Sequence, residues 1–178
     1  MVLGSSQFAD ATAGVVYIHS SPAALCPHIE WALAAALGTP AKLRWTAQPA
    51  AAGQLRATSD WIGPVGTASR IAQALRSWPV LRFEVTEDPS DGVDGERYSF
   101  VPALGLWHGS MSANGDVMIG EMRLRAMLRA ARELDKYSGY DLDAEIDRAL
   151  GTPWDEDLEM YRTGGEGAEV TWLRRDVG

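Results

Sequence analysis

The sequence contains one cysteine, Cys26, in 178 residues. A single thiol cannot form an internal disulfide or supply a four-cysteine zinc site, so a reducing cytoplasm is the expected location. No apolar run approaches the roughly 18 residues that a membrane-spanning helix needs. Residues 1–13 lack the basic and apolar regions of a signal peptide and are expected to form a flexible lead-in.

Acidic residues are concentrated in the second half of the chain. Residues 1–86 carry six basic and four acidic side chains (net +2), and residues 87–178 carry ten basic and twenty acidic ones (net -10), which together give the net charge of -8. An acidic surface repels phosphate backbones and anionic lipid headgroups. We therefore expect neither nucleic acid nor a membrane as a partner.

The clearest strand lies at residues 80–86, where Leu81, Phe83 and Val85 alternate with polar side chains. Before it, the patterns predict strands at 14–19, 42–47 and 55–62, and helices at 20–37 and 67–75. This order is typical of a ferredoxin-like β-α-β-β-α-β core with an antiparallel sheet, so we predict an α+β fold with residues 14–86 as its core. Strand 80–86 is expected to pair with strand 15–19.

Residues 87–178 are predicted to form a C-terminal β-hairpin and helical elaboration that packs on the core as one globular unit. The hairpin turns at Asn114-Gly115 and follows a strand at 97–101. Helices are expected at 121–137, 141–150 and 152–161, and a last strand at 169–173. The first of these helices has an apolar stripe expected to face inward, made up of Leu124, Met127, Leu128, Ala131 and Leu134. We expect these C-terminal elements to cover the sheet face opposite the first two helices.

Four segments carry a resemblance to a known family: SSPAALCPH (20–28), DWIGPVGT (60–67), SWPVLRFEVTEDP (77–89) and LWHG (106–109). Together they resemble an uncharacterised actinobacterial family that is labelled only as a domain of unknown function. The likeness covers nearly the whole chain from about Val15 onward. It implies no activity and no site residues.

A candidate ligand site is the Gly63-Pro64-Val65-Gly66-Thr67 loop before the second predicted helix, with Arg70 just inside that helix. Backbone N–H groups at a helix start bind anions. The loop lacks the Lys-Ser/Thr ending of a P-loop and the third glycine of a dinucleotide fingerprint. A turn followed by a helix cap, with Thr67 as the capping residue, explains the same residues.

Catalytic and metal-binding patterns are weak. Cys26 and His28, with His19 nearby, resemble a nucleophile with a base or a set of metal ligands, but helical spacing places Cys26 on an apolar stripe. His108 could act with Glu84 or Glu121. No triad spacing completes either arrangement, and the acidic turn at 88–96 does not follow the ligand order of a calcium-binding EF-hand. We predict no metal and no cofactor.

Two exposed patches are candidate protein contacts. Trp31 lies away from the apolar stripe of the first helix, one turn after His28. Arg125, Arg129 and Arg132 share one face of the helix at 121–137 and could bind an acidic partner, although i, i+4 surface ion pairs also explain them. We predict a non-catalytic protein-interaction or regulatory module. A small-anion binder that uses Gly63, Gly66, Thr67 and Arg70 is the alternative, and an enzyme centred on Cys26 or His108 is third.

Overall fold

The computed structural model describes residues 11–134 and 140–162. Its strands are β1 (Ala11–Pro22), β2 (Thr46–Ala47), β3 (Gln54–Pro64), β4 (Arg82–Glu87), β5 (Gly95–Val101), β6 (Gly105–Met111) and β7 (Val117–Met118). Its helices are the short 3-10 turn η1 (Ala23–Leu25), α1 (Cys26–Leu37), α2 (Thr67–Leu75), α3 (Glu121–Leu134), α4 (Leu142–Leu150) and α5 (Thr152–Arg162).

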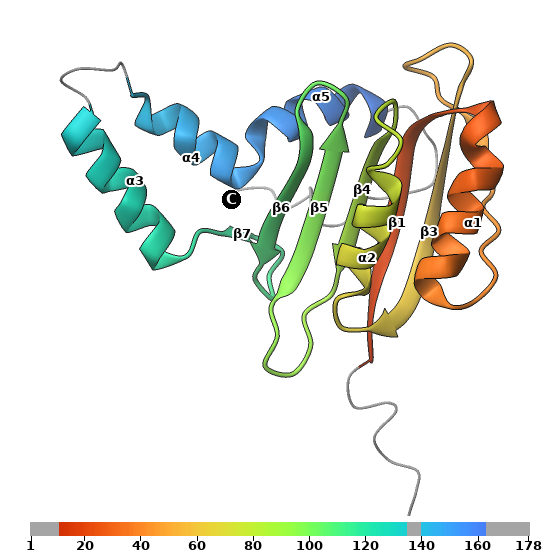
Figure 1. The fold of residues 1–178 in the computed structure, drawn as a ribbon, viewed down its shortest axis with the longest axis horizontal. Coiled ribbons are helices and arrows are strands. Elements are labelled where there is room, and N and C mark those ends of the chain that lie inside the picture. The colour runs from red at the N-terminus through yellow and green to blue at the C-terminus, as the bar shows by residue number, and fades with distance from the viewer. Residues whose placement is uncertain (1–10, 135–139, 163–178) are drawn as a thin grey trace, which may run out of the picture.

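All seven strands form one open antiparallel sheet in the order β2-β3-β1-β4-β5-β6-β7. Strand β1 lies inside the sheet, and β4 pairs with it as predicted, with Val16 opposite Val85. The strands that follow β4 extend the same sheet on that side (Figure 1). The mixed α+β class predicted from the sequence is therefore confirmed.

Helices α1 and α2 cover one face of the sheet (Figure 1). Side chains alternate between the faces of a strand, so Phe83 and Val85 of β4 point to the helices together with Val16 and Ile18 of β1. These four side chains are at most 1% exposed and belong to the main hydrophobic core. Two stripes complete this core: Ile29 and Leu33 from α1, and Ala68, Ile71, Ala72 and Leu75 from α2.

Helix α5 covers part of the opposite face. Its Trp154 and Leu158 form a second, smaller core with Val101 of β5 and Trp107 of β6. Arg82 of β4 reaches the same helix, with its Nε 2.7 Å from the Asp157 carboxylate. The expectation that C-terminal elements cover this face is confirmed for α5. It was wrong for β5, β6 and β7, which extend the sheet itself beside β4.

Strand β1 is longer in both directions than predicted. It begins at Ala11, inside the expected lead-in 1–13, and ends at Pro22, beyond the predicted helix start at Ser20. An irregularity after Ile18 lets the strand bend and keep pairing with β3 up to Gln54. The backbone at Ser20 and Ser21 is therefore in the sheet, and the helix begins only after Pro22.

The strand predicted at 42–47 was wrong in length, since only Thr46 and Ala47 pair with β3. A side chain of α1 holds the preceding residues instead. The Glu30 carboxylate accepts hydrogen bonds from the Leu43 backbone N–H and the Trp45 indole N–H, both at 3.0 Å. Leu43 and Trp45 pack against the main core rather than along a sheet edge.

The inward stripe predicted for the helix at 121–137 was also wrong. Of its five residues only Met127 is buried, whereas Leu124 and Leu128 are each 38% exposed and Leu134 is 44% exposed. Helix α3 packs on α4 and stands away from the sheet (Figure 1). The end of that predicted helix and the predicted strand at 169–173 lie outside the described residues.

Gly14 permits the closest approach between β1 and its neighbours. A Cβ at this position would clash with the Thr86 carbonyl oxygen and with the Trp61 ring. We therefore expect Gly14→Ala to lower the free energy of unfolding by about 1–3 kcal/mol, as overpacking does. Urea denaturation measures the change. Gly120→Ala, with no heavy atom within 4 Å of its Cβ, is the control, and equal effects of the two substitutions would contradict the prediction.

Candidate functional site

Glu84 lies at the centre of a buried charge cluster between the sheet and α5, formed with His19, Arg97, Asp155 and Arg162. The Glu84 side chain is 1% exposed. Its carboxylate oxygens lie 2.6 Å from His19 Nε2, 2.9 Å from Arg97 Nη2 and 2.6 Å from Arg162 Nη2. Asp155 also accepts hydrogen bonds from both arginines. Arg97 and Arg162 are thus bridged by two carboxylates, Glu84 and Asp155.

The cluster balances its charges, with two carboxylates facing two guanidinium groups. Burial alone would raise the pKa of Glu84. The hydrogen bond and charge of His19 and the charges of Arg97 and Arg162 outweigh burial, so the pKa of Glu84 lies well below its ordinary value of 4.5. The pKa of Arg162 is raised because Glu84 and Asp155 outweigh its own burial. Glu84 is therefore a carboxylate throughout the physiological pH range.

Four elements deliver these side chains. His19, Glu84 and Arg97 come from adjacent strands β1, β4 and β5, on the face opposite α1 and α2. Asp155 and Arg162 are seven residues apart on α5, and this spacing places both on one side of a helix. The His19–Glu84 pair has the groups of a general base with its orienting carboxylate. Here both side chains are at least nine-tenths buried and bonded within the cluster, so the arrangement attaches α5 to the sheet.

Gln48 adds a further link to α5. Its side-chain amide donates to the His19 carbonyl at 2.6 Å and to the Tyr161 carbonyl at 3.1 Å. The loop between β2 and β3, strand β1 and the last turn of α5 are thus held together by one buried side chain. Neither Gln48 nor the cluster around Glu84 was predicted from the sequence. His19 was considered only with Cys26 and His28, and Glu84 only as a possible partner of His108.

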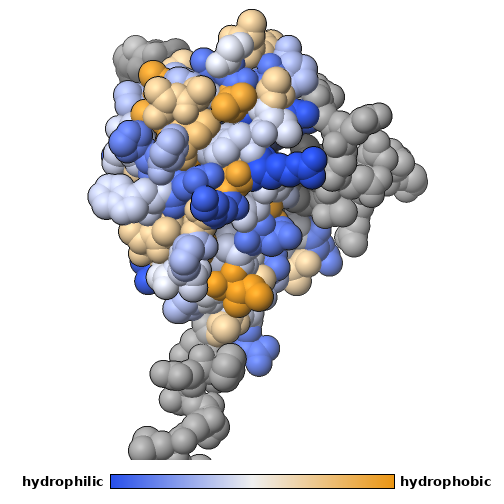
Figure 2. All heavy atoms as spheres, turned by 90° about the vertical axis from the view of Figure 1, so that its right-hand side faces the viewer, coloured by the Kyte–Doolittle hydropathy of each residue, from blue (hydrophilic) through white to orange (hydrophobic). Residues whose placement is uncertain are grey.

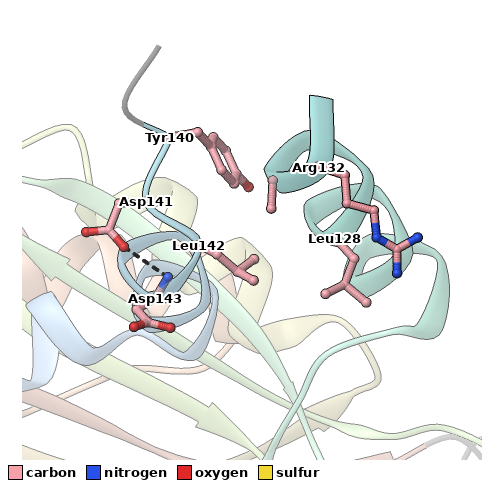
Figure 3. Close-up of a pocket in the computed structure, with 7 residues that line it drawn as sticks. Leu128, Arg132, Tyr140, Asp141, Leu142 and Asp143 are labelled. Atoms are coloured by element: carbon pink, nitrogen blue, oxygen red, sulfur yellow. Dashed lines mark hydrogen bonds between the residues drawn. The ribbon is translucent and has the colours of Figure 1, made fainter. Parts of the chain in front are cut away.

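A candidate contact surface lies on the α3–α4 arm, the pair of helices that projects from the sheet (Figure 1). A hollow of about 590 Å³ lies between the two helices, lined by Leu128, Ala131, Arg132, Tyr140, Asp141, Leu142 and Asp143. Tyr140 and Leu142 point toward α3, whereas the Arg132 guanidinium points away from them (Figure 3). Asp141 accepts hydrogen bonds from the backbone of Asp143 and Ala144 and caps α4.

Three arginines predicted as partner contacts lie on this arm. Arg125, Arg129 and Arg132 are exposed on α3, and Arg125 pairs with Glu121 at 2.7 Å. The other predicted contact patch lies on α1, at the opposite end of the sheet from α3 (Figure 1). There Trp31 is 76% exposed and His28 is exposed one turn earlier. The structure does not bring the two patches onto one element.

Two backbone N–H groups of the predicted anion site are already bonded to a carboxylate of the chain itself. Gly66 precedes α2 with a φ of 87°, so it takes the capping position predicted for Thr67. The N–H groups of Gly66 and Ala68 donate to the two oxygens of the Glu87 carboxylate, at 2.7 and 2.8 Å. Arg70 donates to the Thr67 hydroxyl at 2.8 Å. An external anion would therefore have to displace Glu87.

The candidate catalytic residues are apart from one another. Cys26 is 7% exposed at the start of α1, and burial raises the pKa of its thiol, which makes the reactive thiolate scarce. His108 lies on β6, stacked on Tyr98, with its Nε2 3.5 Å from Glu96. It pairs with neither Glu84 nor Glu121.

Within residues 11–134 and 140–162, no group of three His, Cys, Asp or Glu side chains is placed to hold a metal ion. The same part of the chain contains no helix that is both long enough and apolar enough to cross a membrane.

The fold and its buried cluster define a mixed α/β protein built on an open antiparallel sheet. The chain belongs to the family described as a protein of unknown function (DUF3145), whose profile matches residues 15–175. No curated protein and no solved structure matches the chain.

Removing the charge of Glu84 should destabilise the protein strongly. Glu84→Gln leaves Arg97 and Arg162 with less negative charge in a buried site, and we expect a loss of about 3–5 kcal/mol in the free energy of unfolding. Because the pKa of Glu84 is lowered on folding, its contribution is complete above 4.5 and declines as the pH falls below that value. Urea unfolding at neutral and acidic pH should show a gap between wild type and variant that narrows in acid. Glu156→Gln, on the exposed side of α5, should leave stability unchanged; a gap independent of pH would refute the assignment.

Glu87 should behave as an internal anion. Glu87→Ala frees the N–H groups of Gly66 and Ala68, so we expect a loss of about 1–3 kcal/mol, together with a rise in melting temperature on adding inorganic phosphate. Wild type and Asp88→Ala, the exposed neighbour, should show no phosphate-dependent rise. A rise in wild type that Gly66→Val abolishes would instead support ligand binding by the native site.

Proposed function

We propose that this protein is a non-catalytic protein-interaction module of the cytoplasm and that the α3–α4 arm is its docking element. The observation that carries the proposal is the exposure of the apolar stripe of α3. In this stripe Leu124, Leu128 and Leu134 are between 38% and 44% exposed; Met122, on the other side of the helix, is 79% exposed. Apolar side chains gathered on one exposed helix face are characteristic of protein contact sites.

The charge of α3 indicates the chemistry of the partner. The helix carries Arg123, Arg125, Arg129 and Arg132 against Glu121 and Glu133, a net charge of +2, in a chain of net charge -8. An apolar stripe flanked by arginines complements an acidic segment that presents apolar side chains, as in helix-in-groove recognition. We assign the arm such a partner rather than a second copy, because two α3 helices face to face would oppose their arginines.

The buried cluster supports this function indirectly. It fixes α5 to the sheet, and α4 packs on both α5 and α3, so the arm projects from a rigid base. The reducing cytoplasm fits Cys26, a free and buried thiol. A small-anion binder that uses Gly63, Gly66, Thr67 and Arg70 stays the alternative function, and it requires Glu87 to leave its position.

We also infer that residues 14–86 form a ferredoxin-like core. The order β2-β3-β1-β4, with α1 and α2 on one face, supports this inference. Strands β5, β6 and β7 would then be an addition beside β4.

Loss of the α3 stripe should abolish partner binding without unfolding the protein. We expect wild type immobilised in native lysate to retain a protein that the Leu124→Ser/Leu128→Ser variant does not, because both leucines are exposed in the free chain and buried in the complex. Because each leucine is about three-fifths covered, we expect each substitution to lower the free energy of unfolding by about 1 kcal/mol, and the melting temperature of the variant verifies that it remains folded.

Val93→Ser, at an exposed loop residue, is the control and should retain the partner. Trp31→Ala separates the α1 patch from the arm. A photo-reactive residue in place of Arg125 should cross-link to a partner segment rich in Asp and Glu. Equal retention by wild type and the double variant, or cross-links to a basic segment, would refute the proposal.

A further inference from the structure

Strand β3 has a free edge along eight of its eleven residues. It pairs with β1 from Gln54 to Pro64, but with β2 only at Leu55 and Arg56. Within the described part of the chain, residues 57–64 of β3 therefore have a strand neighbour on one side only.

Backbone N–H and C=O groups alternate in direction along a strand, and this alternation shows which residues of β3 direct them to the free edge. The Gln48 N–H donates to the Gln54 carbonyl at 2.9 Å, so Gln54 faces β2. Successive residues of an antiparallel strand direct their N–H and C=O groups to opposite sides. The β3 register runs without interruption, because the irregularity beside it lies in β1. Thr58, Asp60 and Ile62 thus direct their backbone donors and acceptors outward.

A hollow of about 450 Å³ runs beside these groups. Residues 59–62 of β3 form one wall, and Leu37 with residues 39–42 forms the other. Side chains of consecutive strand residues point to opposite faces, so a hollow lined by four in a row lies along the strand edge. Figure 2 looks onto this side of the molecule and shows separate hydrophobic patches among polar side chains.

At the opposite edge of the sheet, strand β6 is bonded at both of its ends. There the Trp154 indole N–H donates to the Gly105 carbonyl of β6 at 2.9 Å, and β7 pairs with the end of β6. Proteins protect sheet edges with lysines, prolines or bulges. The edge of β3 has Pro64 at its end and Asp60 in its middle, and residues 39–42 lie across the hollow from it without pairing.

We propose that this edge binds an extended segment of another protein, which adds as a further strand beside β3. Three outward residues provide room for a strand of about five residues. Asp60 is exposed, and within the described residues its carboxylate has no hydrogen-bond or ion-pair partner. A basic residue of the segment pairs with it across the strands, and an apolar residue covers Ile62, which is 78% exposed.

A second copy of the chain fits this edge poorly. Symmetric antiparallel pairing about the middle of the open stretch would place Asp60 opposite Asp60, and like charges directly opposite each other destabilise a sheet. The proposal is independent of the α3–α4 arm, since the residues that carry it lie on β3 and beside α1.

The test uses a phage-displayed library of random nonapeptides, selected on wild type with counter-selection on Ile62→Pro. Because the Ile62 N–H faces outward, proline there removes one edge donor without breaking the pairing with β1. Ile62→Val keeps that donor and is the matched control. Melting temperatures of both variants verify folding. We expect enriched peptides that alternate apolar and polar residues around an Arg or Lys.

Fluorescence anisotropy should show binding to Ile62→Pro that is roughly tenfold weaker than to wild type or Ile62→Val. Asp60→Lys should weaken the binding of basic peptides and strengthen the binding of versions that carry Glu in place of the basic residue. Amide exchange at Thr58, Asp60 and Ile62 should slow when peptide is added. The proposal is overturned if no peptide is enriched, if peptides bind Ile62→Pro as tightly as wild type, or if wild type is a dimer that Ile62→Pro dissociates.

Discussion

An ionised carboxylate buried in the middle of a sheet is the constraint on which this fold depends. Glu84 is stable there only because His19, Arg97 and Arg162 surround it, and a buried charge without such partners is very costly. Three separate parts of the chain must therefore come together for the polar face of β4 to be buried. This requirement specifies where α5 lies more sharply than the small apolar core around Trp154 could.

The molecule has a part whose apolar and charged groups are satisfied internally and a part whose groups face solvent. Apolar side chains of the sheet pack against α1, α2 and α5, and charged side chains of the sheet form ion pairs with α5. Helix α3 and the outer edge of β3 keep apolar side chains or backbone groups directed outward. The two features lie at different ends of the sheet (Figure 1), so the two proposed partners would not obstruct each other.

Local patterns predicted much of this structure, and distant contacts explain what they missed. The alternation at residues 80–86 depends on neighbouring residues, so it predicted both the strand and its two faces. The role of Glu84 depends on Arg162, which is 78 residues away, and no local pattern reveals it. The periodicity of α3 correctly predicts a helix with an apolar stripe, but periodicity does not say what covers that stripe. Likewise the loop at Gly63 has the form of an anion site, and only the fold shows that Glu87 occupies it.

The distance between Glu84 and Arg162 along the chain also matters during synthesis. At about 5–20 residues per second, a ribosome needs roughly 4–16 s to add the 78 residues that separate them. During this interval β1, β3 and β4 can already assemble with α1 and α2. The opposite face of these strands stays exposed until α5 is synthesised. That face carries Arg82, Glu84 and Thr86, which water solvates well. The nascent sheet thus exposes its polar side until α5 emerges, and the apolar side, which would aggregate, is covered first.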